Sequence, residues 1–281
     1  MATATQLVPA GFSLAAVLLW GTSDFVGGYA VRRANAFLFA TIVHSSGALF
    51  MLAITMLSQS ILPSRASIVW ALAAGLLGGI SLAIFYRALA AGSMGLAASL
   101  AAVLSAGIPA AVGMVMEGLP GAAPVTGFVL AGIGIWLISR PEDGNRPKGL
   151  GLAVLAGAGF AGFYLCIKQA GQGSALWLAM LSRVGSFAIT ALVALLGRNF
   201  RDITRPYVGL AVFAGCIDVS GSALFVRATQ TGRLDTAVVI SSLYPAVTVL
   251  LAWLLLKERL TRWKTVGMFA ALLAVPLIAL Q

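Results

Sequence analysis

The chain is 281 residues long, 60% hydrophobic and 9% charged, with a mean hydropathy of +1.00. A soluble domain carries about 25% charged residues, so this composition excludes a soluble enzyme, a secreted disulfide scaffold and a disordered chain. The formal charge of +10 does not indicate nucleic-acid binding, because the lysines and arginines lie mainly in short loops between apolar runs, where they set topology and contact lipid headgroups.

Ten apolar runs follow one another along the chain, most of them close to the roughly 20 residues that cross a bilayer. The pattern predicts an all-α polytopic protein of the cell inner (plasma) membrane, with the lipid bilayer as a partner and with no cofactor and no metal. The predicted helices are 12–30, 36–57, 68–89, 93–116, 123–139, 150–170, 174–196, 206–229, 233–256 and 263–280.

The two halves of the chain resemble each other. Tyr86-Arg87-Ala88 recurs in the second half as Val226-Arg227-Ala228, and the fourth and ninth runs end at Glu117 and Glu258, at nearly the same spacing. Each half holds five predicted helices, an odd number, so the second half is expected to cross the membrane in the opposite sense to the first.

Such inverted repeats are typical of secondary transporters, whose substrate site lies near the bilayer midplane between the repeats. We expect a first repeat over 1–140, a polar connector over 141–149 and a second repeat over 150–281.

Four short motifs resemble those of EamA-type members of the drug/metabolite transporter superfamily. They are Trp20-Gly21-Thr22-Ser23-Asp24-Phe25, Tyr86-Arg87-Ala88-Leu89, Ser242-Leu243-Tyr244-Pro245 and Lys257-Glu258-Arg259-Leu260-Thr261. The resemblance covers both halves and implies ten helices, a central cavity and a usually outward movement of small metabolites or drugs. The second half has Ala158-Gly159 in place of Trp-Gly, and the fourth helix has no Tyr-Pro, so a strictly two-fold site is not expected.

Three formal charges, Asp24, Arg183 and Asp218, fall deep inside apolar runs. Each costs about 2.5–3.5 kcal/mol at the centre of a membrane helix, so each is expected to face the bundle interior or a wet cavity. The economical arrangement is an ion pair between Arg183 and Asp218. This pair either joins two helices statically or has a function, in which Arg183 takes a substrate carboxylate or an aspartate carries a coupling proton.

Trp20 and Asp24 are four residues apart and therefore project from one face of the first predicted helix. A carboxylate beside an indole face suits a cationic or amino-bearing substrate, and it is also suited to exchanging protons. The alternative is that Trp20 simply packs against lipid or a neighbouring helix.

His44, the only histidine of the sequence, is a candidate proton carrier or a hydrogen-bonded interior residue. The duplication places it opposite Arg183 or the next residue. Phe163 and Tyr164 are candidate cavity-lining aromatics, together with Tyr86, for which anchoring at the membrane interface is the favoured alternative.

Two prolines, Pro109 and Pro245, are predicted to interrupt helices late in their course. Each leaves the carbonyl four residues earlier without its helical partner, and one of these carbonyls belongs to Ser241. Such carbonyls are tolerated at membrane depth where protein or cavity water satisfies them. We therefore expect hinges at both prolines and a polar cavity wall formed by Ser241, Ser242 and Tyr244; a packing kink without ligand contact is the alternative.

The sequence thus predicts a permease, not an enzyme, that exports small amphipathic metabolites such as amino acids, or drugs, by alternating access. It has no glycine-rich phosphate loop for ATP, so a gradient or the substrate itself must supply the driving force. The alternatives are a proton-coupled multidrug cation exporter that uses Asp24, and a non-transporting membrane scaffold or channel.

The loop charges and the family resemblance predict opposite orientations of the protein in the membrane. Loops after odd-numbered predicted helices carry thirteen Lys and Arg residues, and those after even-numbered helices carry four. The positive-inside rule places the first set in the cytoplasm and both termini outside, whereas the family resemblance implies cytoplasmic termini. We give the charge count the greater weight.

Overall fold

The computed structural model describes residues 4–91, 94–118, 121–138, 140, 149–197, 205–257 and 261–279. These residues form helices and connecting turns, and no strand occurs among them. The helices are α1 (Ala4–Val31), α2 (Ala36–Leu57), α3 (Arg65–Ala91), α4 (Met94–Glu117), α5 (Ala122–Ile138), α6 (Leu150–Ala170), α7 (Ala175–Leu196), α8 (Arg205–Thr231), α9 (Leu234–Ser241), α10 (Tyr244–Leu256) and α11 (Arg262–Ala279). Most of the predicted connector over 141–149 lies outside the described residues.

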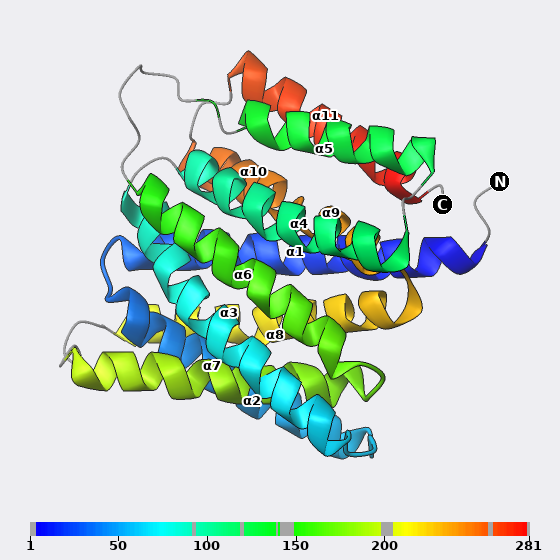
Figure 1. The fold of residues 1–281 in the computed structure, drawn as a ribbon. Coiled ribbons are helices and arrows are strands. Elements are labelled where there is room, and N and C mark those ends of the chain that lie inside the picture. The colour runs from blue at the N-terminus through cyan, green and yellow to red at the C-terminus, as the bar shows by residue number, and fades with distance from the viewer. Residues whose placement is uncertain are drawn as a thin grey trace.

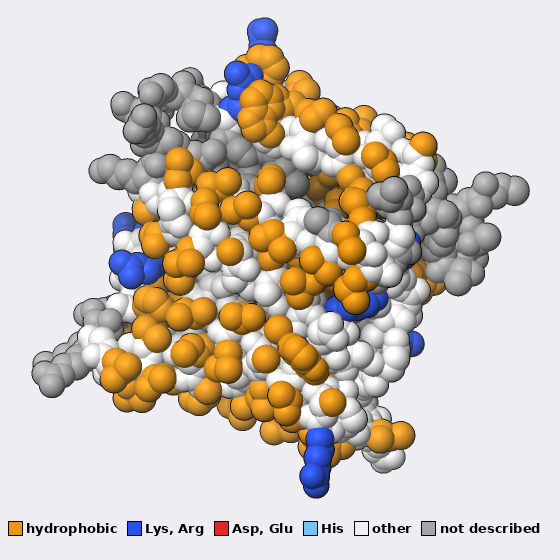
Figure 2. Space-filling view, viewed as in Figure 1, with side chains coloured by type: hydrophobic (Ala, Val, Ile, Leu, Met, Phe, Trp, Pro, Cys, Tyr) orange, Lys and Arg blue, Asp and Glu red, His pale blue; other side chains and the backbone are white. Residues whose placement is uncertain are grey.

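Within the described residues, seven helices are long and apolar enough to cross a membrane, as expected of a multi-pass membrane protein. They are Leu7–Val31, Ala36–Leu57, Arg65–Ala91, Leu150–Ala170, Ala175–Leu196, Arg205–Thr231 and the combined stretch Thr236–Leu256. Shorter apolar helices cover Leu100–Met116 and Ala122–Gly134. The bundle presents hydrophobic side chains over its visible face, with Lys and Arg mainly at its margins (Figure 2), which is the distribution a lipid environment favours.

The prediction of one continuous helix over 233–256 was wrong. α9 ends at Ser241, and α10 begins at Tyr244 with Pro245 in its first turn. A proline is well tolerated there because the first amide groups of a helix have no helical acceptor. Pro245 thus follows a break instead of interrupting a helix late in its course, whereas α4 runs through Pro109 without a break.

The helices approach closely where small residues meet. A Cβ atom added to Gly75 or Gly79 of α3 would collide with the backbone of α7 at Ser182 or Ser186, and the Ser186 hydroxyl donates to the Gly75 carbonyl at 2.9 Å. Small residues at such crossings let backbones touch, which stabilises helix pairs inside lipid.

Both chain termini lie at the same end of the bundle, where α1 begins and α11 approaches its end (Figure 1). We call this the termini end. The α2–α3, α4–α5, α6–α7 and α8–α9 connections also lie there, and the α1–α2 connection lies at the opposite end (Figure 1).

Candidate functional site

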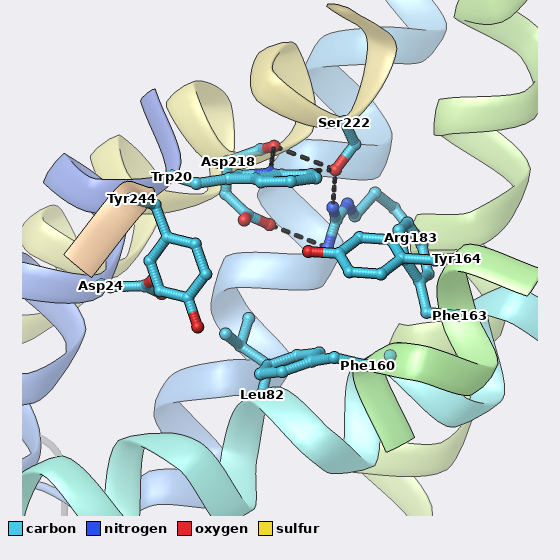
Figure 3. Close-up of a pocket in the computed structure, with 11 residues that line it drawn as sticks. Trp20, Asp24, Leu82, Phe160, Phe163, Tyr164, Arg183, Asp218, Ser222 and Tyr244 are labelled. Carbon is cyan, nitrogen blue, oxygen red and sulfur yellow. Dashed lines mark hydrogen bonds and ion pairs between the residues drawn. The ribbon is translucent and has the colours of Figure 1, made fainter. Parts of the chain in front are cut away.

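A cavity of about 50 Å³ lies inside the bundle (Figure 3). Its walls come from α1, α3, α6, α7, α8 and α10, so helices of both halves of the chain contribute. The lining residues are Trp20, Asp24, Gly78, Leu82, Phe160, Phe163, Tyr164, Arg183, Asp218, Ser222 and Tyr244.

The predicted ion pair between α7 and α8 is present. Nη1 of Arg183 lies 2.8 Å from Oδ2 of Asp218, and both side chains are buried. Nη2 of Arg183 donates to the Ser222 hydroxyl, which in turn donates to the Asp218 carbonyl at 3.1 Å. The guanidinium is therefore held by two neighbouring turns of α8, and its charge is neutralised inside the protein.

His44 lies behind this pair and not on the cavity wall. Its Nδ1 atom is 3.3 Å from Nη1 of Arg183. Because a guanidinium has only donors, Nδ1 must present its lone pair, which requires that Nδ1 carry no proton. The His44 side chain is fully buried, and it accepts a hydrogen bond from the Arg183 guanidinium. If His44 carried a proton, its positive charge would lie directly beside that of Arg183.

Trp20 forms the wall of the cavity next to the ion pair. Its indole Nε1 donates to the Asp218 carbonyl at 3.1 Å and lies 3.4 Å from the Ser222 hydroxyl. Its ring packs against Phe225 with centroids 5.4 Å apart and against Tyr164 at 6.1 Å. Trp20 therefore packs inside the bundle, and the alternative of a lipid contact does not hold.

Asp24 reaches the same cavity one helical turn after Trp20 and lies beside the Tyr244 ring (Figure 3). It is 6% exposed. Among the residues that the structure describes, no hydrogen-bond donor or cation pairs with its carboxylate. A buried carboxylate without a partner is costly, so this group is the one carboxyl of the described cavity wall that is left to take up a proton or a cationic ligand.

Aromatic rings surround the space in front of Asp24. Tyr164 contacts Phe225 and Phe163 with centroid distances of 4.8 and 5.6 Å, and Tyr244 packs edge-on against Phe85 at 6.2 Å. The Tyr244 hydroxyl has no hydrogen-bond partner among the described residues. Such rings provide apolar area and π faces that attract cations.

Two predicted wall residues lie away from the described lining. The Ser242 hydroxyl bonds back to the Val238 carbonyl at 2.7 Å within the helical turn. Ser241 is fully buried, and its hydroxyl has no partner among the described residues. Tyr244 is the one member of this predicted wall that the cavity lining includes.

The favoured role of Tyr86 as an interface anchor was wrong. Its side chain is fully buried and packs edge-on against Phe39 at 5.7 Å. Its ring occupies the space that a Cβ atom on Gly27 would fill, so the glycine makes room for the tyrosine inside the bundle.

Four lining residues were not predicted: Gly78, Leu82, Phe160 and Ser222. Ser222 is four residues after Asp218 and shares its helix face, a signal that the sequence contains. Leu82 and Phe160 sit in apolar runs where nothing distinguishes them from packing residues. Among the described residues, no group of three His, Cys, Asp or Glu side chains is placed to hold a metal ion.

Comparison with known proteins gives one match to a family model and one fold match. A solved structure titled only "Crystal structure of protein" has the same fold, with a TM-score of 0.74 over 96% of this chain and 95% of its own, at 15% sequence identity. No curated protein matches the sequence. Residues 147–280 match the model of the EamA-like transporter family, whose members are transporters and not enzymes. The match covers the second half of the chain and supports its identification as an EamA-type member of the drug/metabolite transporter superfamily.

Proposed function

We propose that this protein is a secondary transporter that exports small amphipathic molecules carrying an amine or another cationic group, by alternating access across the plasma membrane. The observation that carries the proposal is the unpaired, buried Asp24 carboxylate on the wall of an aromatic cavity.

The charges of the cavity favour a cation over an anion. Arg183 and Asp218 neutralise each other at 2.8 Å, so the described lining carries one net negative charge when Asp24 is ionised. A bound ammonium group would neutralise this charge in a low-dielectric site, where the attraction is much stronger than in water. The Trp20, Tyr164 and Tyr244 rings would cover the apolar part of the same molecule and add cation–π attraction.

Zwitterionic amino acids are the second candidate class, because their ammonium group also fits Asp24. Their carboxylate would need Arg183, whose guanidinium already contacts Asp218, Ser222 and His44. Binding of a carboxylate there would displace an existing partner. We therefore rank amines above amino acids, in contrast to the expectation from sequence.

The inverted duplication is also part of this proposal, and the packing of the helices supports it. If the second half repeats the first, α1 corresponds to α6, α2 to α7, α3 to α8 and α5 to α11. The pair α1–α8 then corresponds to the pair α6–α3, and the helices of both pairs pack extensively on each other. Helices α2 and α7 also pack on each other, as do α5 and α11. Helices α3 and α8 both have 27 residues, and they begin at Arg65 and Arg205.

The cavity wall follows the same correspondence between α3 and α8. When the two helices are aligned from their first residues, Gly78 corresponds to Asp218 and Leu82 to Ser222, and each of these residues lines the cavity. A shared central site between two inverted repeats is the arrangement that alternating access uses. One repeat supplies a polar residue where the other supplies glycine or leucine, which gives the site its asymmetry.

Transport of three probes that share one ring tests the proposal. Phenethylamine is an amine, phenylalanine a zwitterion and 3-phenylpropionate an acid. Each compound is radiolabelled and loaded into proteoliposomes of purified protein, and its efflux is followed with and without a proton gradient. We expect efflux in the order amine, then zwitterion, with the acid at the rate of empty liposomes. Faster efflux of the acid than of the amine would overturn the assignment.

The proton gradient separates exchange from simple facilitated transport. If one carboxylate alternately binds a proton and an amine, an inwardly directed proton gradient accelerates amine efflux, and the Asp24→Asn variant loses both the efflux and its response to the gradient. Asp235→Asn is the matched control, because it removes the aspartate at the second position of α9, far from Asp24 along the chain.

A further inference from the structure

We propose that the hydrogen bonds and packing contacts at the termini end are a closed gate, with Trp177 and Gln230 as its central residues. This inference rests on the proposed alternating-access transport and names the part of the molecule that must open for substrate to reach the termini side.

The first element of this gate joins the two halves of the chain. Nε1 of Trp177, in the first turn of α7, donates to the Ser60 carbonyl in the α2–α3 connection at 2.9 Å. Beside it, a Cβ atom on Gly173 of the α6–α7 connection would lie 3.2 Å from the Cβ atom of buried Pro63. The two connections therefore lie directly against each other.

Gln230 fixes the same α6–α7 connection from the other side. Its side-chain Nε2, near the end of α8, donates to the carbonyls of Gly171 at 3.2 Å and Gly173 at 2.9 Å. One amide group thus bonds two carbonyls of a glycine-rich turn, and this turn is held between α8 and the α2–α3 connection.

Two further contacts cross between the halves at this end. Nη2 of Arg233 donates to the Gly118 carbonyl at 2.8 Å, and Gly232 packs so closely against Pro9 of α1 that an added Cβ atom would lie 2.8 Å from the proline Cβ. Separation of these segments at the termini end must break both contacts.

The opposite end differs at the corresponding position. Ala90 of α3 corresponds to Gln230 of α8 in the alignment of these two helices, and alanine has no side-chain amide to bond a neighbouring turn. Ala90 lines a groove of about 500 Å³, together with Val31 and Asn35 of the α1–α2 region and Arg87. The geometry therefore assigns a closed state to the termini end, whereas the corresponding position at the opposite end lies in a groove.

A reversible cross-link tests the gate. In a background with the two free cysteines replaced, Cys166→Ser and Cys216→Ser, the pair Pro63→Cys and Gly173→Cys has Cβ atoms near the 3.5–4.5 Å that a disulfide needs. We expect oxidation to lower phenethylamine efflux at least tenfold and reduction to restore it. The single-cysteine variants are the controls and should not respond to the oxidant.

Binding measurements separate this inference from the proposed function. The oxidised protein in detergent should still bind phenethylamine, because the cross-link holds only the termini end closed. A fully cross-linked protein that transports at the rate of its reduced form would overturn the gate, and so would failure of the pair to oxidise. A reduced protein that neither binds nor transports the amine would instead overturn the proposed function.

A second measurement does not depend on the cross-link. The double variant Trp177→Phe and Gln230→Ala removes the hydrogen bonds and keeps an aromatic ring at 177. It should accelerate labelling of Pro63→Cys by a membrane-impermeant thiol reagent several-fold, because Pro63 is buried while the connections are together. An unchanged labelling rate would contradict the gate.

Discussion

His44 and Arg183 occupy the same position, the ninth, of two 22-residue helices, α2 and α7, and Nδ1 of the one lies 3.3 Å from Nη1 of the other. The two helices are equivalent if the second half repeats the first. A histidine in one half thus meets an arginine at the equivalent place in the other half. The contact orients the guanidinium toward α8, where Asp218 and Ser222 hold it.

The ion pair between α7 and α8 is predicted to stabilise the fold without binding substrate. Asp218→Asn leaves a buried guanidinium without its counter-charge and should destabilise the protein by about 3–5 kcal/mol. Thermal unfolding in detergent measures this as a lower Tm. The double variant Arg183→Met and Asp218→Asn removes both charges and should recover most of the loss; a double variant as unstable as the single one would show that the charge itself is not the cause.

Gly78 is predicted to set the width of the cavity. An added Cβ atom would lie 2.9 Å from Cδ2 of Phe163, so Gly78→Ala should push this ring toward the centre and weaken binding of bulky amines more than that of small ones. The ratio of affinities for a naphthyl and a phenyl amine should fall several-fold. Gly209→Ala, in α8, is the matched control, since nothing lies within 4 Å of its added Cβ atom. An unchanged ratio in Gly78→Ala would remove Gly78 from the specificity determinants.

The orientation of the protein remains a prediction from its loop charges. Arg32 and Arg33 follow α1 at the end opposite the termini, and the thirteen-to-four excess of basic residues places that end in the cytoplasm. A periplasmic phosphatase fused after Gln281 should therefore be active, and a fluorescent protein at the same place should stay dark. The reverse pair of signals would support the cytoplasmic termini that the family resemblance implies.

The sequence reveals the charged part of the site because charges in apolar runs are expensive. This reasoning singles out Asp24, Arg183 and Asp218. The free-energy cost of their charges is low only where they face a cavity or the bundle interior. The pairing of Arg183 with Asp218 followed from their depth in adjacent helices. The unpaired state of Asp24 did not, because a lack of partners depends on the tertiary arrangement around the residue.

The rest of the site has no comparable signal. Leu82 and Phe160 line the cavity with residue types that also fill every packed interface of the bundle. The sequence predicted that Pro245 interrupts one long helix, whereas the helix ends before it. A proline marks either a kink or the first turn of a new helix, and its position within an apolar run does not decide between them. Tyrosine is a residue type enriched at membrane interfaces, but Gly27 provides a space for the Tyr86 ring inside the bundle.

The proposed function requires that the Asp24 carboxylate bind the cationic group of the substrate. Equilibrium binding of phenethylamine to purified wild-type protein and to Asp24→Asn, with Asp235→Asn as control, tests it most directly. Loss of one partner of a buried charge pair costs about 2 kcal/mol or more, so the affinity of Asp24→Asn should fall at least about 30-fold while the control is unchanged. Equal affinity of the wild type and Asp24→Asn, with both proteins folded, would contradict the claim.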